Sequence, residues 1–304
     1  PISPKRQIVM LASLIIGLLI PFGILYVLFL LDTKVNNKVE LQKKLANLSV
    51  VGEIPQLTKH AKAVIGANDR SVLAEAFRIL RTNLNYFKSP TDLEDNGQVV
   101  FVTSTTKGEG KTFVAVNLAN ILAATKKKTL LIGCDLRNPQ VHTYIDKDKN
   151  YKGVSSFLHN PSVQMEDLIL KRAFNFENLD VVLSGAIPPN PAELLLNGRF
   201  EELIAEAKSK YDYVIIDTAP TILVTDTLLI SKYADATMYM VRAGYTDVKL
   251  LKHIEELQKQ RKLNNMGIVL NGVKEDGAYG YNYGYGYGYS EEIKKKPLWK
   301  FWAK

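Results

Sequence analysis

The stretch that decides the fold is "TSTTKGEGKT", Thr103–Thr112, which lies between the apolar run "QVVFVTS" (98–104) and the helical pattern "FVAVNLANILAAT" (113–125). A glycine-rich loop between a strand and a helix arranges backbone N–H groups and a helix N-terminus around an anion. Lys111 is then placed to reach phosphate, and the Thr112 hydroxyl to bind magnesium. The spacing departs from GxxxxGK[ST] because Thr105 replaces the first glycine, while Lys107 adds a second lysine. The strand–loop–helix context favours a phosphate-binding loop over a chance glycine-rich turn.

Short apolar runs of the strand type recur along the chain and alternate with helical patterns. Alternation of this kind predicts parallel βαβ units, and hence an α/β fold with a doubly wound, mostly parallel sheet covered by helices on both faces. The predicted strands are residues 98–104, 128–135, 179–184, 211–217, 236–241 and 266–271.

Acidic residues follow two of these runs. Asp135 and Arg137 come at the end of the second strand, and Asp217 ends the fourth. Ligands of open α/β sheets bind at the carboxyl ends of the strands. Asp135 alone is equally typical of a helix N-cap. Beside a phosphate-binding loop, both carboxylates are better interpreted as magnesium-coordinating, directly or through water.

An uncharged segment of 24 residues spans residues 8–31. As a helix it would be roughly 36 Å long, which is enough to cross a bilayer. A signal peptide is disfavoured because the run is too long, and a buried core helix because the segment has no polar face. Lysines are more numerous after the segment than before it, which predicts a cytoplasmic C-terminal side. Residues 1–7 are then expected to be the extracytoplasmic end of a longer protein.

Composition excludes several classes of site. The 304 residues carry a formal net charge of +8, but the lysines are spread along the chain, which favours an anionic membrane surface over nucleic acid. Cys134 is the one cysteine and lies in an apolar run, so an internal disulfide is excluded and a buried, inert thiol is expected. The four histidines are scattered, without zinc-site spacing.

Together these motifs resemble those of the bacterial tyrosine kinase (BY-kinase) family, the cytoplasmic autokinases of polysaccharide co-polymerases. Residues 107–112 resemble the deviant Walker A loop that this family shares with partitioning and division-site ATPases. Residues 131–137 resemble its second Walker-type motif, and residues 214–217 its Walker B motif. The segment "SGAIPPNPAELL" (184–195) is also similar. The resemblance implies a P-loop NTPase fold preceded by one transmembrane helix.

The resemblance also implies ATP and Mg²⁺ as cofactors and a set of site residues. The catalytic residues are Lys107, Lys111, Asp135 and Asp217, and the metal ligands are Thr112, Asp135 and Asp217. The nucleotide-binding residues are Thr106, Lys107, Gly108, Glu109, Gly110, Lys111, Thr112, Phe113 and Arg137, with Asn271 against the base by analogy with related ATPases. One departure is Gly133, which stands where the second Walker-type motif carries the first aspartate of DxD. It puts in doubt which residue is the general base.

The helical pattern from Ser71 contains "EAFRILR", with Glu75, Arg78 and Arg81 along one side. A solvated salt-bridge face would explain this spacing. The match to the ExxRxxR element of the family implies instead a ring-like homo-oligomer.

The C-terminal segment places tyrosines at alternating positions, separated by glycine or asparagine. This composition is typical of a flexible low-complexity tail. In an autokinase the phenols would be acceptors, phosphorylated in trans in the site of a neighbouring subunit. The acceptors are Tyr279, Tyr281, Tyr283, Tyr285, Tyr287 and Tyr289. The final "EEIKKKPLWKFWAK" is typical either of a lipid-contacting segment or of a disordered basic tail.

The predicted organisation is a transmembrane helix at 8–31, a cytoplasmic linker at 32–68, a kinase domain at 69–275 and a tail at 276–304. The resemblance implies a bacterial inner-membrane protein that regulates exopolysaccharide polymerisation and export. Its implied partners are other copies of itself, the export machinery and a tyrosine phosphatase, with no nucleic acid. The rival hypothesis is a membrane-tethered P-loop ATPase switch that phosphorylates nothing.

Overall fold

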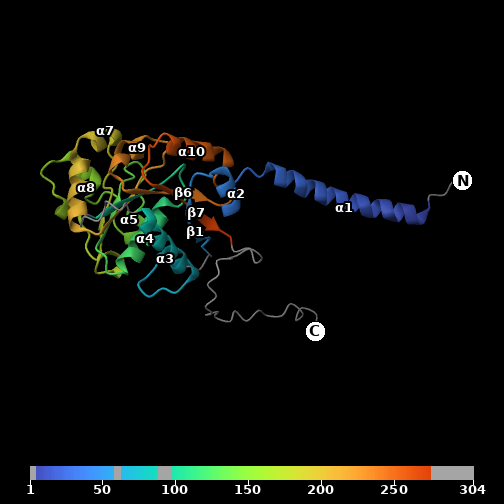
Figure 1. Cartoon of the computed structure of the whole chain (residues 1–304), viewed down its shortest axis with the longest axis horizontal. Coiled ribbons are helices and arrows are strands. Elements are labelled where there is room, and N and C mark those ends of the chain that lie inside the picture. The colour runs from blue at the N-terminus through green and yellow to red at the C-terminus, as the bar shows by residue number, and fades with distance from the viewer. Residues whose placement is uncertain (1–4, 58–62, 88–96, 275–304) are drawn as a thin grey trace. The chain divides into compact units, whose positions relative to one another are not determined.

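A computed structural model describes residues 5–57, 63–87 and 97–274 of the chain (Figure 1). The chain divides into two units, Pro1–Lys274 and Glu275–Lys304. The predicted acceptor tyrosines and the basic aromatic tail lie outside the described residues.

The centre of the fold is a seven-stranded sheet in the order β1-β7-β6-β2-β5-β3-β4, in which every neighbouring pair is parallel. This confirms the predicted doubly wound α/β fold, and all six predicted strands form. The strands are β1 (Val50–Pro55), β2 (Gln98–Ser104), β3 (Thr129–Gly133), β4 (Leu179–Val182), β5 (Tyr213–Asp217), β6 (Ala236–Arg242) and β7 (Met266–Val273).

Helices cover both faces of this sheet, because side chains alternate along each buried strand. On β2, Val100 and Val102 pack in the same core cluster as α3 (Val72–Leu84) and α4 (Lys111–Ala123). Val99 and Phe101 point to the opposite face. That face is covered by α2 (Lys38–Lys44), α6 (Val154–His159), α8 (Arg199–Lys210) and α10 (Leu251–Lys259). Shorter helices are α5 (His142–Ile145), α7 (Pro191–Leu196) and α9 (Asp226–Ile230).

The predicted linker, residues 32–68, contributes to the sheet. Its residues 50–55 form β1, which pairs with β7 in the register Val50↔Ile268 and Ile54↔Asn271. Gly52 allows close packing against α3, since a Cβ there would lie 2.9 Å from Leu80 Cδ1. This strand is not among those that the sequence pattern predicts. The "GEIP" within it combines a glycine, a charge and a proline, which strands tolerate mainly at sheet edges.

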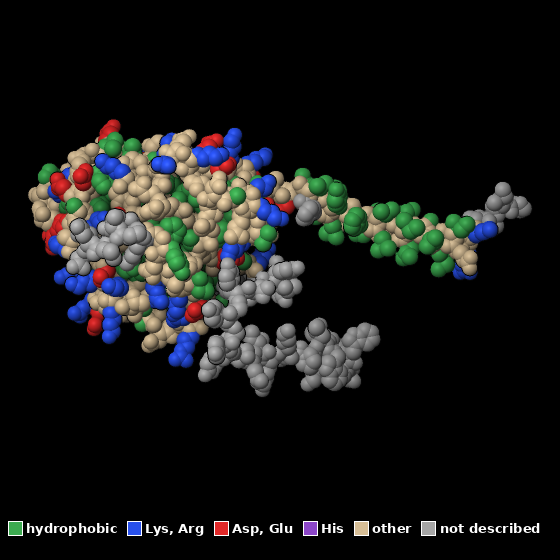
Figure 2. All heavy atoms as spheres, viewed as in Figure 1, with side chains coloured by type: hydrophobic (Ala, Val, Ile, Leu, Met, Phe, Trp, Pro, Cys, Tyr) green, Lys and Arg blue, Asp and Glu red, His purple; other side chains and the backbone are tan. Residues whose placement is uncertain are grey.

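The predicted membrane segment forms a single helix, α1 (Arg6–Leu31). Within Arg6–Leu28, the most apolar window of 18 residues has a mean hydropathy of 2.7, and none of that window is buried. Apolar side chains follow the length of the helix (Figure 2). By length and composition, α1 is able to cross a membrane.

Candidate active site

The phosphate-binding loop lies at the carboxyl end of β2, which is in the middle of the sheet between β5 and β6. The loop ends at Gly110, and α4 begins at Lys111. Gly108 and Gly110 both adopt left-handed conformations, with φ of 89° and 99°. A Cβ on Gly110 would lie 2.1 Å from Asn271 Nδ2, so this position requires glycine for space as well as for conformation.

Three successive carbonyls of this loop are held by side chains from β6, β7 and the loop after β6. Tyr245 donates its hydroxyl to the Lys107 carbonyl at 3.0 Å, and Arg242 Nη1 donates to the Gly108 carbonyl at 2.8 Å. Asn271 Nδ2 donates to the Glu109 carbonyl at 3.0 Å. The C=O and N–H groups of a peptide point in opposite directions. Because these carbonyls point toward β6 and β7, the amide groups of the same peptides point the other way and are available to bind an anion.

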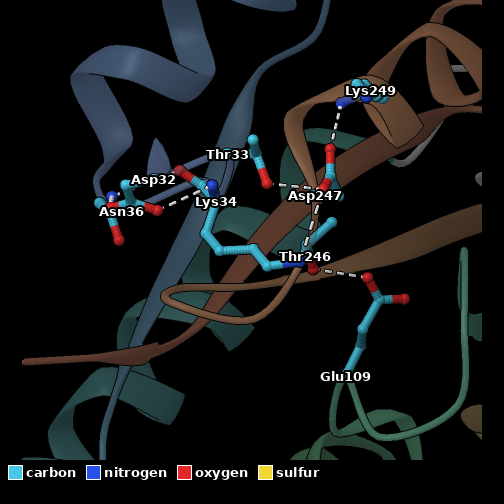
Figure 3. Close-up of polar contacts among 8 residues, drawn as sticks. All are labelled: Asp32, Thr33, Lys34, Asn36, Glu109, Thr246, Asp247 and Lys249. Carbon is cyan, nitrogen blue, oxygen red and sulfur yellow. Dashed lines mark hydrogen bonds and ion pairs between the residues drawn. The ribbon is translucent and has the colours of Figure 1, made fainter. Parts of the chain in front are cut away.

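The carboxylate of Glu109 supports the loop from inside. It is fully buried and accepts a hydrogen bond from the Thr106 amide at 2.7 Å. It also accepts one from Thr246 Oγ1 at 2.5 Å (Figure 3). Burial raises the pKa of Glu109, and these hydrogen bonds oppose that rise. The side chain of this predicted nucleotide-binding residue is therefore engaged with the protein itself.

The residues predicted to hold magnesium meet at the edge where β3 and β5 end. Thr112 Oγ1 donates to Asp217 Oδ2 at 2.6 Å. Asp217 Oδ1 is buried without a hydrogen-bond partner among the residues that the structure describes. Burial raises the pKa of Asp217 to about 7, although the Lys111 charge and the Thr112 hydrogen bond oppose the shift. An unsatisfied carboxylate oxygen beside a threonine hydroxyl fits the oxygen-rich coordination of Mg²⁺.

Asp135 lies two residues beyond β3, where the charge of Lys111 acts on it as it does on Asp217. Its Oδ1 accepts a hydrogen bond from the Asn138 amide at 2.9 Å. Burial raises its pKa, while the Asn138 bond and Lys111 lower it. Asp135 therefore also holds the bend that follows β3, but it is not the helix N-cap of the alternative interpretation, because the next helix, α5, begins only at His142.

Gly133, the position of the missing DxD carboxylate, has no space for a side chain. A Cβ there would lie 2.7 Å from Ser184 Oγ, 3.2 Å from the Ser184 amide nitrogen and 3.3 Å from Val141 Cγ2. Residue 133 faces Asp217 across the β3–β5 pair. Ser184 thus occupies the volume that a carboxylate would need, and Asp135 is the acid that this motif retains.

Arg137, a predicted nucleotide contact, forms an ion pair with a residue that the sequence analysis missed. Its Nε and Nη2 contact the two carboxylate oxygens of Asp226 at 2.7 and 3.0 Å. The Asp226 side chain is 3% exposed and that of Arg137 44% exposed. Asp226 starts a short helix 89 residues away in sequence, so no local pattern pointed to the pair.

A buried polar network behind the loop was also missed. Tyr239 OH contacts Thr105 Oγ1 at 3.1 Å and Thr221 Oγ1 at 2.7 Å, and Thr221 contacts His253 Nε2 at 3.0 Å. The Thr221 amide donates to the Ser104 carbonyl at 2.8 Å. This network ties the start of the phosphate-binding loop to the segment after Asp217.

The remaining predicted residues lie apart from this centre or take other contacts. Lys107 is exposed, whereas Phe113 packs edge-on against Phe77 with ring centroids 5.8 Å apart. On α3, Glu75 and Arg78 form the expected ion pair at 3.0 Å, and Arg81 is half-buried. The ring-like oligomer remains a prediction.

Comparison with known proteins places these features in a family. The family described as "AAA domain" matches residues 97–266. The tyrosine-protein kinase YwqD of Bacillus subtilis is 37% identical over 214 residues, which cover 70% of this chain and 87% of that protein. The tyrosine-protein kinase wzc of Salmonella typhimurium is 30% identical over 291 residues, which cover 90% of this chain and 39% of that protein.

Among solved structures, the kinase domain of the Escherichia coli tyrosine kinase ETK superimposes with a TM-score of 0.69 at 29% identity. The match covers 83% of this chain and 99% of that domain. The chain spans about 40% of the length of the first curated relatives that it matches, such as wzc. On the sequence motifs, the fold and these matches, the chain belongs to the bacterial tyrosine kinase family and is built on an AAA-type P-loop domain.

Proposed function

We propose that this chain is the kinase portion of a membrane-anchored protein-tyrosine autokinase that uses Mg-ATP. The observation that carries the proposal is the hydrogen bond between Thr112 and Asp217, next to Lys111 at the end of the phosphate-binding loop. Side chains of the protein bind three carbonyls of this loop, so that its amides remain available for phosphate. Membership of a tyrosine kinase family selects phosphoryl transfer among the reactions that such a site supports.

In the proposed reaction, the amides of Gly108 and Gly110 bind the phosphates at the N-terminus of α4. Lys111 neutralises charge that develops on the transferring group. Thr112 and Asp217, with Asp135 as a further acid, would hold Mg²⁺, which lowers the charge on the β- and γ-phosphates when bound.

The chemical step joins a tyrosine oxygen to the γ-phosphorus and breaks the γ-phosphorus bond to the oxygen of ADP. The phenol proton must leave as the new bond forms, and Asp135 is the candidate acceptor. Burial raises the pKa of Asp135 in the absence of metal. A carboxylate that coordinates Mg²⁺ is a weaker base, so Asp135 acts either as the proton acceptor or as a metal ligand. Lys107, which is exposed at the tip of the loop, is free to act on phosphate in its own site or that of a neighbouring subunit.

The proposed substrates are the tail tyrosines between residues 279 and 289, each entering the site of a neighbouring subunit in a ring. Each phosphate adds about −1.5 to −2 charges, so successive phosphorylations would weaken the assembly by repulsion. With α1 in the bacterial inner membrane and the kinase in the cytoplasm, this cycle would couple kinase state to polysaccharide polymerisation and export. A tyrosine phosphatase would reset it.

The experiment is incubation of the protein with Mg-ATP, followed by mapping of phosphate by mass spectrometry. We expect multiple phosphotyrosines within residues 277–290 in the wild type and none in Lys111→Met. A wild-type tail that stays as unmodified as the Lys111→Met tail would overturn the proposal.

The rival function, an ATPase switch without kinase activity, uses the same site and differs only in the acceptor. Deleting residues 277–290 separates the two hypotheses. An autokinase loses its phosphotyrosine but keeps ATP turnover, whereas a pure ATPase has no phosphotyrosine to lose.

A further inference from the structure

We propose that residues Arg242–Asp247, here called the positioning loop, fix the phosphate-binding loop in its anion-binding shape and are themselves held by Thr33–Val35, directly after α1. The inference rests on the proposed nucleotide site. It makes Thr246 a positioning residue and links the order of the membrane-proximal segment to nucleotide affinity.

On the nucleotide side, the link depends on the hydroxyl of Thr246. It accepts a hydrogen bond from the Arg242 amide at 2.9 Å and donates to Glu109 Oε1 at 2.5 Å. Thr246 is 1% exposed and Glu109 is fully buried, so removing this hydroxyl leaves a buried carboxylate oxygen without that donor. Glu109 in turn fixes the Thr106 amide, and with it the curvature of the loop.

On the membrane-proximal side, the positioning loop pairs with Thr33–Val35 through the backbone. The Val35 amide donates to the Thr246 carbonyl at 2.9 Å, and Gly244 donates to the Val35 carbonyl at 2.9 Å. Val248, just beyond the positioning loop, donates to the Thr33 carbonyl at 2.8 Å. These bonds flank an antiparallel bridge between Lys34 and Asp247.

Side chains reinforce the pairing, as Figure 3 shows. Asp247 Oδ2 accepts hydrogen bonds from Thr33 Oγ1 at 2.8 Å and Lys34 Nζ at 3.5 Å. Its other oxygen accepts from the Lys249 amide at 3.0 Å, which starts the turn toward α10. Asp247 therefore connects the membrane-proximal segment to the body of the domain.

The segment after α1 is also ordered internally. Asp32 accepts hydrogen bonds from the Lys34 amide at 3.0 Å and from Asn36 Nδ2 at 2.7 Å. Val35 is fully buried in a core cluster that includes Tyr239 and Val241 of β6. A segment fixed in this way cannot move independently of the loop that it pairs with.

The consequence follows from Thr246 taking part in both sets of contacts. Its carbonyl binds Val35, which is four residues after Leu31, and its hydroxyl binds the phosphate-binding loop. A displacement of Thr33–Val35 must therefore move Thr246 or break these bonds. Conversely, a nucleotide that rigidifies the phosphate-binding loop must stabilise the Val35 pairing, because coupling between two sites is reciprocal.

The test uses the full chain in lipid nanodiscs and measures amide hydrogen exchange with and without a non-hydrolysable ATP analogue and Mg²⁺. We expect the analogue to slow exchange at the amides of Val35, Gly244 and Val248 in the wild type. Thr246→Val should abolish this response and weaken analogue binding by about fivefold, the effect of one lost hydrogen bond. Thr246→Ser keeps the hydroxyl and should restore both.

Thr125→Val is the matched control, because among the described residues the Thr125 hydroxyl bonds locally, to the Leu122 carbonyl at the far end of α4. It should behave as the wild type. Unchanged exchange at Val35 when the wild type binds the analogue, or an equal response in Thr246→Val, would overturn the inference. Failure of the wild type to bind the analogue would overturn both the inference and the proposed function. Binding without tail phosphorylation would overturn only the function.

Discussion

Thr112 and Asp217 lie at the ends of different elements, yet Thr112 Oγ1 donates a 2.6 Å hydrogen bond to one carboxylate oxygen and leaves the other buried and unpaired among the described residues. The site thus contains a carboxylate with one buried oxygen that receives no hydrogen bond from the described residues. Burial of that carboxylate is what raises its pKa to about 7.

The first prediction concerns the pH dependence of stability without Mg²⁺. The pKa of Asp217 is about 7 in the folded state, compared with about 4 in the unfolded chain, so the folded state binds this proton more tightly. The free energy of unfolding therefore falls as the pH rises from about 4 to about 7. Asp217→Asn should be more stable than the wild type at pH 8, by an amount on the order of 4 kcal/mol, and nearly equal to it at pH 4. Thermal unfolding in EDTA at both pH values measures this. An Asn variant whose advantage does not grow with pH would contradict it.

A second prediction compares two glycines with similar backbone conformations. Gly110 and Gly198 have φ of 99° and 86°, but a Cβ meets Asn271 at the first and nothing within 4 Å at the second. Gly198→Ala should cost roughly 1–2 kcal/mol of stability and leave nucleotide binding unchanged. Gly110→Ala should also weaken nucleotide binding more than tenfold, measured by fluorescence titration. Equal nucleotide affinity in the two variants would show that the Asn271 contact is unimportant.

The third prediction addresses the missing carboxylate of the second Walker-type motif. Gly133→Asp should lower the melting temperature rather than raise activity, because Ser184 and Val141 fill the space. Adding Ser184→Ala removes the nearest atom and should recover part of the loss. Gly66→Asp, at a position with nothing within 4 Å of a Cβ, is the control and should melt as the wild type does. A stable and more active Gly133→Asp would contradict the packing argument.

A fourth prediction concerns the Arg137–Asp226 ion pair. Arg137→Ala leaves a carboxylate that is 3% exposed without its guanidinium, which should cost about 2–3 kcal/mol after allowance for the solvent exposure of Arg137. Asp226→Asn in the Arg137→Ala background should recover much of that cost, because it removes the buried charge. Chemical unfolding of the wild type, both single variants and the double variant gives the coupling energy. Additive effects would show that the pair contributes no coupling.

The parts of this structure that sequence predicted are those with local signatures. Strands β2 to β7 each contain a short run made mostly of apolar residues, and the phosphate-binding loop has its glycines, lysines and threonines within ten residues. The acids at the ends of β3 and β5 followed from the rule that parallel strands end at one edge. The helix α1 followed from its composition alone.

The parts that sequence missed depend on residues far apart in the chain. Thr246 and Glu109 are separated by 137 residues, and no sequence motif that contains one of them predicts contact with the other. Gly133 was recognised as a departure, but only the packing of Ser184 shows why the position is closed. Strand β1 was missed because its stability comes from pairing with β7 rather than from its own residues.

The pairing of β1 with β7 determines where the chain can be shortened. A fragment that begins at residue 69, the predicted start of the kinase domain, would lack β1 and expose the backbone groups of β7 along a full edge. Unpaired edge strands promote association with other chains, so such a fragment is expected to aggregate. One that begins before Val50 keeps the edge covered. A soluble form of this enzyme therefore has to retain residues that sequence alone would assign to a linker.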